Sequence, residues 1–147
     1  MIFVCGKLGC GKSTYAKQIA QVKSYKMIEV SDIVKGILKQ TERSKLQGHP
    51  ELDSIIIREI LSYGPDTVVS GVRQVSILKA FDLAEQFIWI EVSEEERYRR
   101  LANRLDDKDP IKTKEAFLIA QERDNTLGVP EVESFIKSNP KGKVVNG

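Results

Sequence analysis

The stretch GKLGCGKST, residues 6–14, decides the fold that we expect for this chain. It crowds three glycines into six positions and then places two hydroxyl side chains directly after a lysine. The four residues before it, Ile2–Cys5, are apolar and predict a buried strand, whereas Thr14–Val22 carries its small and apolar residues at helical spacing. The stretch therefore joins a buried strand to an amphipathic helix.

The spacing Gly6-x-x-x-x-Gly11-Lys12-Ser13 is that of a phosphate-binding loop. Small residues allow several backbone N–H groups to turn inward as an anion nest, and the positive end of the following helix dipole points at the same place. The Lys12 ammonium would reach the β- and γ-phosphates of ATP, and the Ser13 hydroxyl would ligate Mg²⁺. The alternative is a glycine-rich turn that only connects a strand to a helix. The residues predicted to bind ATP are Gly6, Gly9, Cys10, Gly11, Lys12, Ser13 and Thr14.

Composition indicates one globular domain, residues 1–147. Apolar residues make up 41% of the chain and charged residues 30%, and the net charge of +2 gives no global basic field for nucleic acid. No apolar run is long enough to span a bilayer, and the apolar start is too short for a signal peptide. The two cysteines, Cys5 and Cys10, are interpreted as small buried residues in a reducing compartment. We therefore expect a cytoplasmic protein with a small-molecule substrate and no membrane partner; its oligomeric state stays open.

Strand-like and helical segments alternate along the chain, which predicts an α/β fold with a mainly parallel five-stranded sheet and helices on both faces. The predicted strands are Ile2–Cys5, Lys26–Val30, Thr67–Ser70, Phe87–Val92 and Val144–Val145. The predicted helices are Thr14–Val22, residues 32–40, Leu52–Tyr63, Val75–Ala84, Ser93–Leu105, Lys112–Asn125 and Pro130–Lys137. Ser93 and Glu96 have the spacing of a capping box at a helix start.

Several arginines lie where strands and helices end, as transfer of a phosphoryl group requires. Arg73 follows the third predicted strand, at the end of a parallel sheet where ligands bind. Arg100 and Arg104 are four residues apart on one helix, and Arg123 lies on the next helix. These four arginines and Lys12 are the predicted catalytic residues. Arg97 and Arg99, by contrast, are expected to lie on the surface.

The chain resembles the nucleoside monophosphate kinase group of P-loop proteins, which includes adenylate kinase, dephospho-CoA kinase and phage deoxynucleoside monophosphate kinases. The segment EVSDIVK, residues 29–35, is similar to the one that opens the acceptor site in that group, and Asp32 matches its carboxylate. SGVR, residues 70–73, is similar to the element whose arginine holds the acceptor phosphate. RLANR, residues 100–104, is similar to the paired arginines at the base of the lid.

Two longer stretches extend this resemblance over nearly the whole chain. Residues 104–128 resemble uncharacterised small kinases related to dephospho-CoA kinase, in which a short lid precedes a helix with an RD pair. ERSKLQG, residues 42–48, is similar to an acceptor-domain stretch of phage deoxynucleoside monophosphate kinases. The resemblance implies a helical acceptor segment at about 32–63 and a lid at about 105–112. It also implies ATP and Mg²⁺ as cofactors, with Asp32, Lys35, Arg73 and Gln74 as acceptor-binding residues.

Two positions depart from the pattern of the group. Many members carry an acidic residue at the end of the third strand, where this chain has Ser70. Lys35 stands where adenylate kinase carries arginine, and lysine lacks the bidentate fork that suits phosphate. The chain also ends at Gly147, directly after the fifth predicted strand.

The reaction that the sequence predicts is phosphoryl transfer from ATP to a nucleoside monophosphate, with a deoxynucleoside monophosphate favoured. One alternative is another acceptor, either dephospho-CoA or the 5′-hydroxyl of a nucleoside or polynucleotide. Asp32 would act as the base in the hydroxyl case; otherwise it would orient the acceptor or cap the following helix. A second alternative is a module that binds nucleotide without transferring phosphate.

Overall fold

The structure is a computed structural model of the chain and describes residues 1–40, 50–104 and 111–147. These residues form five strands: β1 (Ile2–Gly6), β2 (Lys26–Glu29), β3 (Thr67–Ser70), β4 (Gln86–Glu91) and β5 (Gly142–Asn146). They also form seven helices: α1 (Lys12–Lys23), α2 (Val30–Gln40), α3 (Pro50–Ser62), α4 (Val75–Lys79), α5 (Glu94–Ala102), α6 (Lys114–Leu127) and α7 (Val129–Ser138).

The five strands form one sheet in the order β2-β3-β1-β4-β5, and all neighbouring pairs are parallel. The predicted five-stranded α/β fold is therefore confirmed. Strand β1 lies at the centre, between β3 and β4, so the glycine-rich loop leaves the sheet in its middle. In a parallel sheet the carboxyl ends of all strands meet at one edge, where ligands bind.

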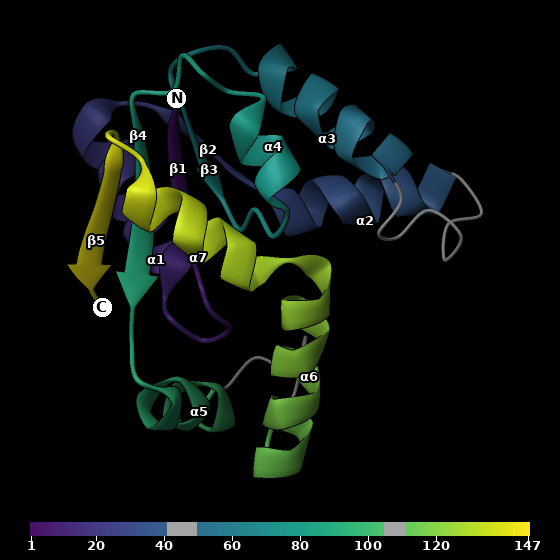
Figure 1. The fold of residues 1–147 in the computed structure, drawn as a ribbon, viewed down its shortest axis with the longest axis vertical. Coiled ribbons are helices and arrows are strands. Elements are labelled where there is room, and N and C mark those ends of the chain that lie inside the picture. The colour runs from purple at the N-terminus through teal and green to yellow at the C-terminus, as the bar shows by residue number, and fades with distance from the viewer. Residues whose placement is uncertain (41–49, 105–110) are drawn as a thin grey trace.

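Helices cover both faces of the sheet, as expected (Figure 1). On one face α1 packs closely because it presents small residues, Ala16 and Ala20, to the side chains of β1 and β3. On the other face α3, α4 and α7 bury a larger core around Phe3 and Trp89. Both faces of the sheet are thus buried from solvent, as expected for inner strands that are almost wholly apolar.

Several helix boundaries differ from those expected from the sequence, and those of α2 and α4 have structural consequences. Helix α2 begins at Val30, directly after β2, so Asp32 lies in its first turn rather than at a cap. Helix α4 ends at Lys79, whereas a helix to residue 84 was predicted. The chain turns there because the amides of Phe81 and Ala84 bond to carbonyls three residues back and both side chains are buried.

Helices α5 and α6 lie beyond the carboxyl ends of the strands, the ends to which the arrowheads of β4 and β5 point (Figure 1). They pack on each other through a separate apolar cluster of Leu101, Ile111 and Phe117, which Leu8 joins from the glycine-rich loop. This pair of helices is therefore attached to the loop by its own small core.

The acceptor segment at about 32–63 and the lid at about 105–112 stay predictions. Helices α2 and α3 cover much of the first range, but residues 41–49, which include ERSKLQG, lie outside the described residues. Residues 105–110 of the lid also lie outside them. No helix in the described ranges is both long and apolar enough to cross a membrane.

The packing of α3 on the sheet predicts how one truncation changes stability. Ile56 of α3 is 1% exposed, so Ile56→Ala should lower the free energy of unfolding by about 2–5 kcal/mol. Leu61 on the same helix is 58% exposed, and Leu61→Ala should change it by about 0.5 kcal/mol or less. Urea unfolding followed by circular dichroism measures both values. Equal losses for the two variants would show that α3 does not pack through this face.

Candidate functional site

The glycine-rich loop joins β1 to α1 at the centre of the sheet edge, and its backbone needs glycine at two points. Gly9 and Gly11 have φ angles of 82° and 87°, a region that other residues adopt only with strain. Space is also lacking at Gly9, because a β-carbon there would lie 2.8 Å from the carbonyl oxygen of Arg97. Gly11 is the N-cap residue of α1, and its carbonyl accepts from the amide of Tyr15 at 3.1 Å. The predicted loop-to-helix junction is thus present.

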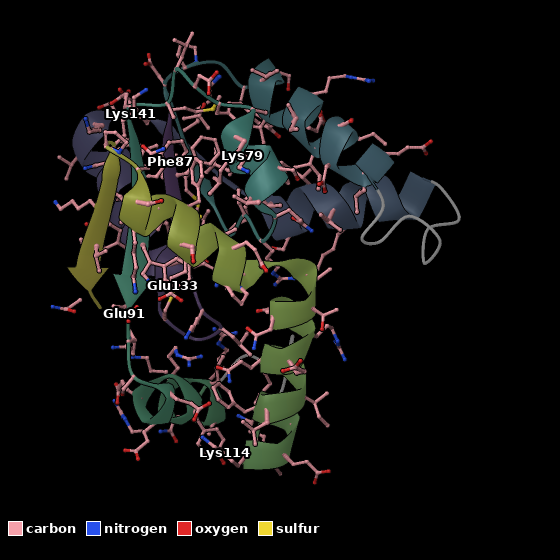
Figure 2. All side chains as sticks on the ribbon, viewed as in Figure 1. Lys79, Phe87, Glu91, Lys114, Glu133 and Lys141 are labelled. Atoms are coloured by element: carbon pink, nitrogen blue, oxygen red, sulfur yellow. The ribbon has the colours of Figure 1, made fainter. Side chains whose placement is uncertain are left out.

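Helix α7 and the loop's own backbone hold the start of the loop. Lys7 Nζ lies 3.9 Å from Glu133 Oε1, and Figure 2 shows Glu133 where α7 passes the loop. The carbonyl of Lys7 accepts from the amide of Cys10 at 3.1 Å, which closes a tight turn. The loop therefore has a defined shape before any ligand is considered.

Arg97 of α5 is buried against this loop, so the expectation of a surface position is wrong for it. Its side chain is 3% exposed; Nη1 donates to the carbonyl of Leu8 at 3.1 Å and Nε to that of Val92 at 3.2 Å. The guanidinium also lies 5.5 Å from the centre of the Phe117 ring on α6. Burial lowers its pKa below the usual value, although an arginine stays protonated. Arg99 is exposed, as expected.

Arg100, one turn further along α5, reaches the same loop. Its Nη1 donates to the carbonyl of Cys10 at 3.1 Å, and its Nε to Glu96 Oε1 at the same distance. Hydrogen bonds from Arg99 and then Arg100 lower the pKa of Glu96 to about 2. The predicted cap of this helix is present, because the amide of Glu96 donates to Ser93 Oγ at 3.3 Å. The cap and the ion pair fix the turn of α5 that carries both loop-binding arginines.

Lys12 extends from the first turn of α1 towards the ends of β2 and β3. A β-carbon on Gly71, just past β3, would lie 3.8 Å from both Lys12 Cε and Glu29 Oε2. Burial raises the pKa of the Cys5 thiol to about 12, and the Lys12 ammonium opposes that rise from close by. The lysine and the Glu29 carboxylate thus flank one point at the centre of the strand ends.

Glu29 is a site residue that the sequence analysis missed. It ends β2, and the sheet register places it beside Ser70 at the end of β3. Ser70 is fully buried, and within the described part of the chain its hydroxyl has no hydrogen-bond partner. A carboxylate therefore lies one strand away from the position where the third strand lacks one. Only the strand order, which the sequence does not reveal, brings the two residues together.

Arg73 lies in the segment between β3 and α4, as predicted, and is held by a carboxylate that was not predicted. Its Nε lies 3.4 Å from Oδ1 of Asp124, a residue of α6 that is 9% exposed. Gln74 occupies the position that precedes α4 and is half-buried. The RD pair in α6 was the available signal, but the arginine rather than the aspartate was singled out.

The other predicted site residues are exposed around this centre. Asp32 and Lys35 lie on α2, Arg104 follows α5, and Arg123 lies on α6. Within the described ranges no hydrogen bond or ion pair joins Asp32, Lys35 or Arg123 to the loop. The structure therefore brings together the loop, Lys12 and Arg100. Asp32, Lys35 and Arg123 do not bond to the loop within the described residues.

The described residues contain no group of three potential metal ligands from histidine, cysteine and carboxylate side chains. Cys5 and Cys10 are both free and buried, in agreement with the expectation from the sequence. A metal at this site would consequently depend on Ser13, Glu29 and phosphate oxygens rather than on a preformed protein cluster.

Solved structures share this fold at low sequence identity. A shikimate kinase from Bacteroides thetaiotaomicron aligns with a TM-score of 0.62 and 16% identity, covering 97% of this chain and 83% of its own. A gluconokinase from Sinorhizobium meliloti 1021 aligns with a TM-score of 0.63 and 20% identity, covering 99% and 81%. At these identities the likeness shows the fold alone. The search of curated proteins finds no match.

A family profile described as an AAA domain matches residues 2–121. The match includes the loop, strands β1 to β4, helices α1 to α5 and the first part of α6. The match covers most of the chain and includes each arginine that contacts the loop. The chain belongs to this AAA domain family of P-loop proteins.

Proposed function

We propose that the protein transfers the γ-phosphoryl group of ATP·Mg²⁺ to a nucleoside monophosphate, with deoxynucleoside monophosphates favoured. The observation that carries the proposal is the position of Lys12. It directly follows the glycine-rich loop, and its side chain lies beside Gly71 and Glu29 at the carboxyl ends of the central strands. The fold shared with two proteins named as kinases supports it.

The loop would bind the donor. Its backbone amides and the start of α1 attract the phosphates, and Lys12 neutralises charge on the β- and γ-phosphates. Phosphoryl transfer depends more on positioning the γ-phosphoryl group and neutralising its charge than on covalent catalysis. A loop of fixed shape with one lysine ammonium is suited to that reaction.

The residues near Lys12 fit a magnesium ion that keeps several water ligands. Ser13 is exposed in the first turn of α1, Glu29 supplies a carboxylate, and the buried hydroxyl of Ser70 lacks a partner among the described residues. Oxygen ligands of this kind suit Mg²⁺, and a water ligand would satisfy Ser70. When bound, the ion would be held by Ser13 with Glu29 nearby, and it would supply positive charge that offsets the charge of the phosphates.

The acceptor phosphate would lie on the side of β3 and α2. Arg73 is 41% exposed in its side chain, so its guanidinium keeps open donors while Asp124 holds one edge. Gln74 follows it, and Asp32 and Lys35 are one turn apart on α2. These four residues are the proposed acceptor-binding set.

The arginines of α5 and α6 would exclude water from the transferring group. Arg104 and Arg123 are exposed, and their side chains would turn towards a bound γ-phosphate as the two helices approach it. Arg100 is already beside the loop and would add its charge there. The role of all three at the γ-phosphate is a proposal.

A hydroxyl acceptor is the second candidate, and Glu29 is the observation that favours it. The Glu29 carboxylate and the Lys12 side chain flank Gly71, and a carboxylate near Lys12 could take the proton of an alcohol, which a monophosphate acceptor does not require. Dephospho-CoA and 5′-hydroxyl compounds belong to this candidate. If no acceptor supports turnover, the remaining alternative is a module that binds nucleotide without transferring phosphate.

A turnover screen tests the proposal. ATP·Mg²⁺ is supplied with each nucleoside and deoxynucleoside monophosphate, dephospho-CoA, or a 5′-hydroxyl oligonucleotide, and ADP is measured by a coupled assay. We expect ADP production that depends on a monophosphate. Turnover with a hydroxyl compound alone would move the assignment to the second candidate, and no acceptor-dependent ADP would contradict transfer altogether.

Removing the loop cation should abolish most of the turnover. Lys12→Ala is expected to lower kcat by about 100- to 1000-fold, because an uncompensated charge develops on the moving group. Circular dichroism should show an unchanged fold, since Lys12 is not part of either core. Lys17→Ala, an exposed lysine of the same helix, is the matched control and should keep full activity. Wild-type turnover in Lys12→Ala would place the donor elsewhere.

Glu29→Gln separates the two acceptor classes, because glutamine keeps the shape and removes the base. For a monophosphate acceptor we expect a loss of kcat of about tenfold, through weaker magnesium support alone, which excess Mg²⁺ partly restores. For a hydroxyl acceptor the loss should reach about 100- to 10,000-fold at any magnesium concentration. Turnover measured across a magnesium series with the preferred acceptor distinguishes them.

A further inference from the structure

Two arginines of α5 bind alternate carbonyl groups of the phosphate-binding loop. Arg97 donates to the carbonyl of Leu8 and Arg100 to that of Cys10, each at 3.1 Å. The two arginines are three residues apart on one helix and therefore share a face, while the two carbonyls are two residues apart in the loop. One face of α5 thus donates hydrogen bonds to two loop carbonyls that are separated by one residue.

Because the peptide bond is planar, fixing the direction of a carbonyl also fixes the direction of the N–H group of the following residue. The described residues contain no cis peptide bond, and in a trans peptide the C=O and the following N–H point in opposite directions. Holding the Leu8 carbonyl towards α5 therefore directs the Gly9 N–H away from α5. Holding the Cys10 carbonyl does the same for the Gly11 N–H.

Both amides are left available for a ligand. Within the described part of the chain, neither the Gly9 nor the Gly11 N–H donates a hydrogen bond to the protein, whereas the intervening Cys10 N–H closes the turn onto Lys7. Backbone N–H groups rarely stay unpaired unless water or a ligand binds them. The two amides oriented by the arginines are thus among the amides of the loop and the helix start that donate to no protein acceptor.

We propose that Arg97 is a positioning residue for the phosphate site: with Arg100 it forms a carbonyl clamp that aims the Gly9 and Gly11 amides at the bound triphosphate. The inference rests on the proposed donor role of the loop. Arg97 is the stronger member, because it is buried and also bonds Val92 at the end of β4. The clamp therefore ties the loop to the sheet.

The charge of Arg97 supports a role in anion binding beyond packing. Among the described residues no carboxylate lies within ion-pair distance of its guanidinium, and its hydrogen-bond partners are two carbonyls. Burial outweighs the attraction of Glu94 and Glu91 and lowers the pKa of Arg97, so its charge is only partly compensated by the protein. A triphosphate on the far side of the Leu8–Gly9 peptide would add negative charge near this cation.

The clamp is tested by nucleotide binding and by the amides themselves. Protein labelled with ¹⁵N-glycine gives one amide signal for each of its ten glycines, which ATP·Mg²⁺ titration then shifts. We expect Arg97→Met to weaken ATP binding by about 10- to 100-fold and to remove the shift of Gly9 more than that of Gly11. Arg100→Met should show the reverse preference. Arg97→Lys, which keeps the charge and one donor, should recover part of both effects.

Arg58→Met is the matched control for loss of an arginine, because Arg58 is an exposed residue of α3 that takes no part in the Glu96 ion pairs; this variant should bind ATP with the wild-type Kd. Should Arg97→Met fail to fold, Arg97→Lys decides the matter. Wild-type Kd and an unchanged Gly9 shift in a folded Arg97 variant would overturn the clamp. Wild-type protein that binds ATP and shows the clamp, yet transfers no phosphate to any acceptor, would overturn only the proposed function. Wild-type protein that does not bind ATP would overturn both.

Discussion

The orientation of a few peptide groups between β1 and α1 is the constraint on which the site depends. Amide groups attract phosphate only if several point at one place, and a flexible glycine-rich loop would not hold them so. Left-handed backbone at Gly9 and Gly11 makes the shape possible. The Cys10–Lys7 turn, two arginines of α5 and, more weakly, Glu133 of α7 stabilise this shape. The central place of β1 in the sheet then sets this loop in the middle of the strand ends.

Helix α6 connects the loop to the proposed acceptor side. Near its start Phe117 lies against the Arg97 guanidinium, and near its end Asp124 binds Arg73. Figure 2 places Lys114, the first residue of α6, next to α5, and its ammonium lies 5.0 Å from the Phe117 ring. Because one rigid helix contacts both arginines, a displacement of α6 would alter the donor and acceptor sides together.

The sequence predicted the loop, the sheet and most helices, because these follow from local spacing and apolar periodicity. It could not predict which arginine of α5 is buried. Arg97, Arg99 and Arg100 look alike in the sequence, and only the packing of α6 and the loop against α5 distinguishes them. Glu29 was missed for a related reason: its position beside Ser70 depends on strand order, which is a property of the whole fold. The roles of Arg104 and Arg123 stay predictions.

A crystal structure with a non-hydrolysable ATP analogue and Mg²⁺ tests the central claim most directly. The account predicts that the β-phosphate lies in the loop with the Gly9 and Gly11 amide nitrogens about 2.7–3.2 Å from its oxygens. Lys12 should contact the γ-phosphate, and Arg97 should keep its bond to the Leu8 carbonyl. A nucleotide bound elsewhere, or a loop whose Gly9 and Gly11 amides turn away from the phosphates, would contradict it.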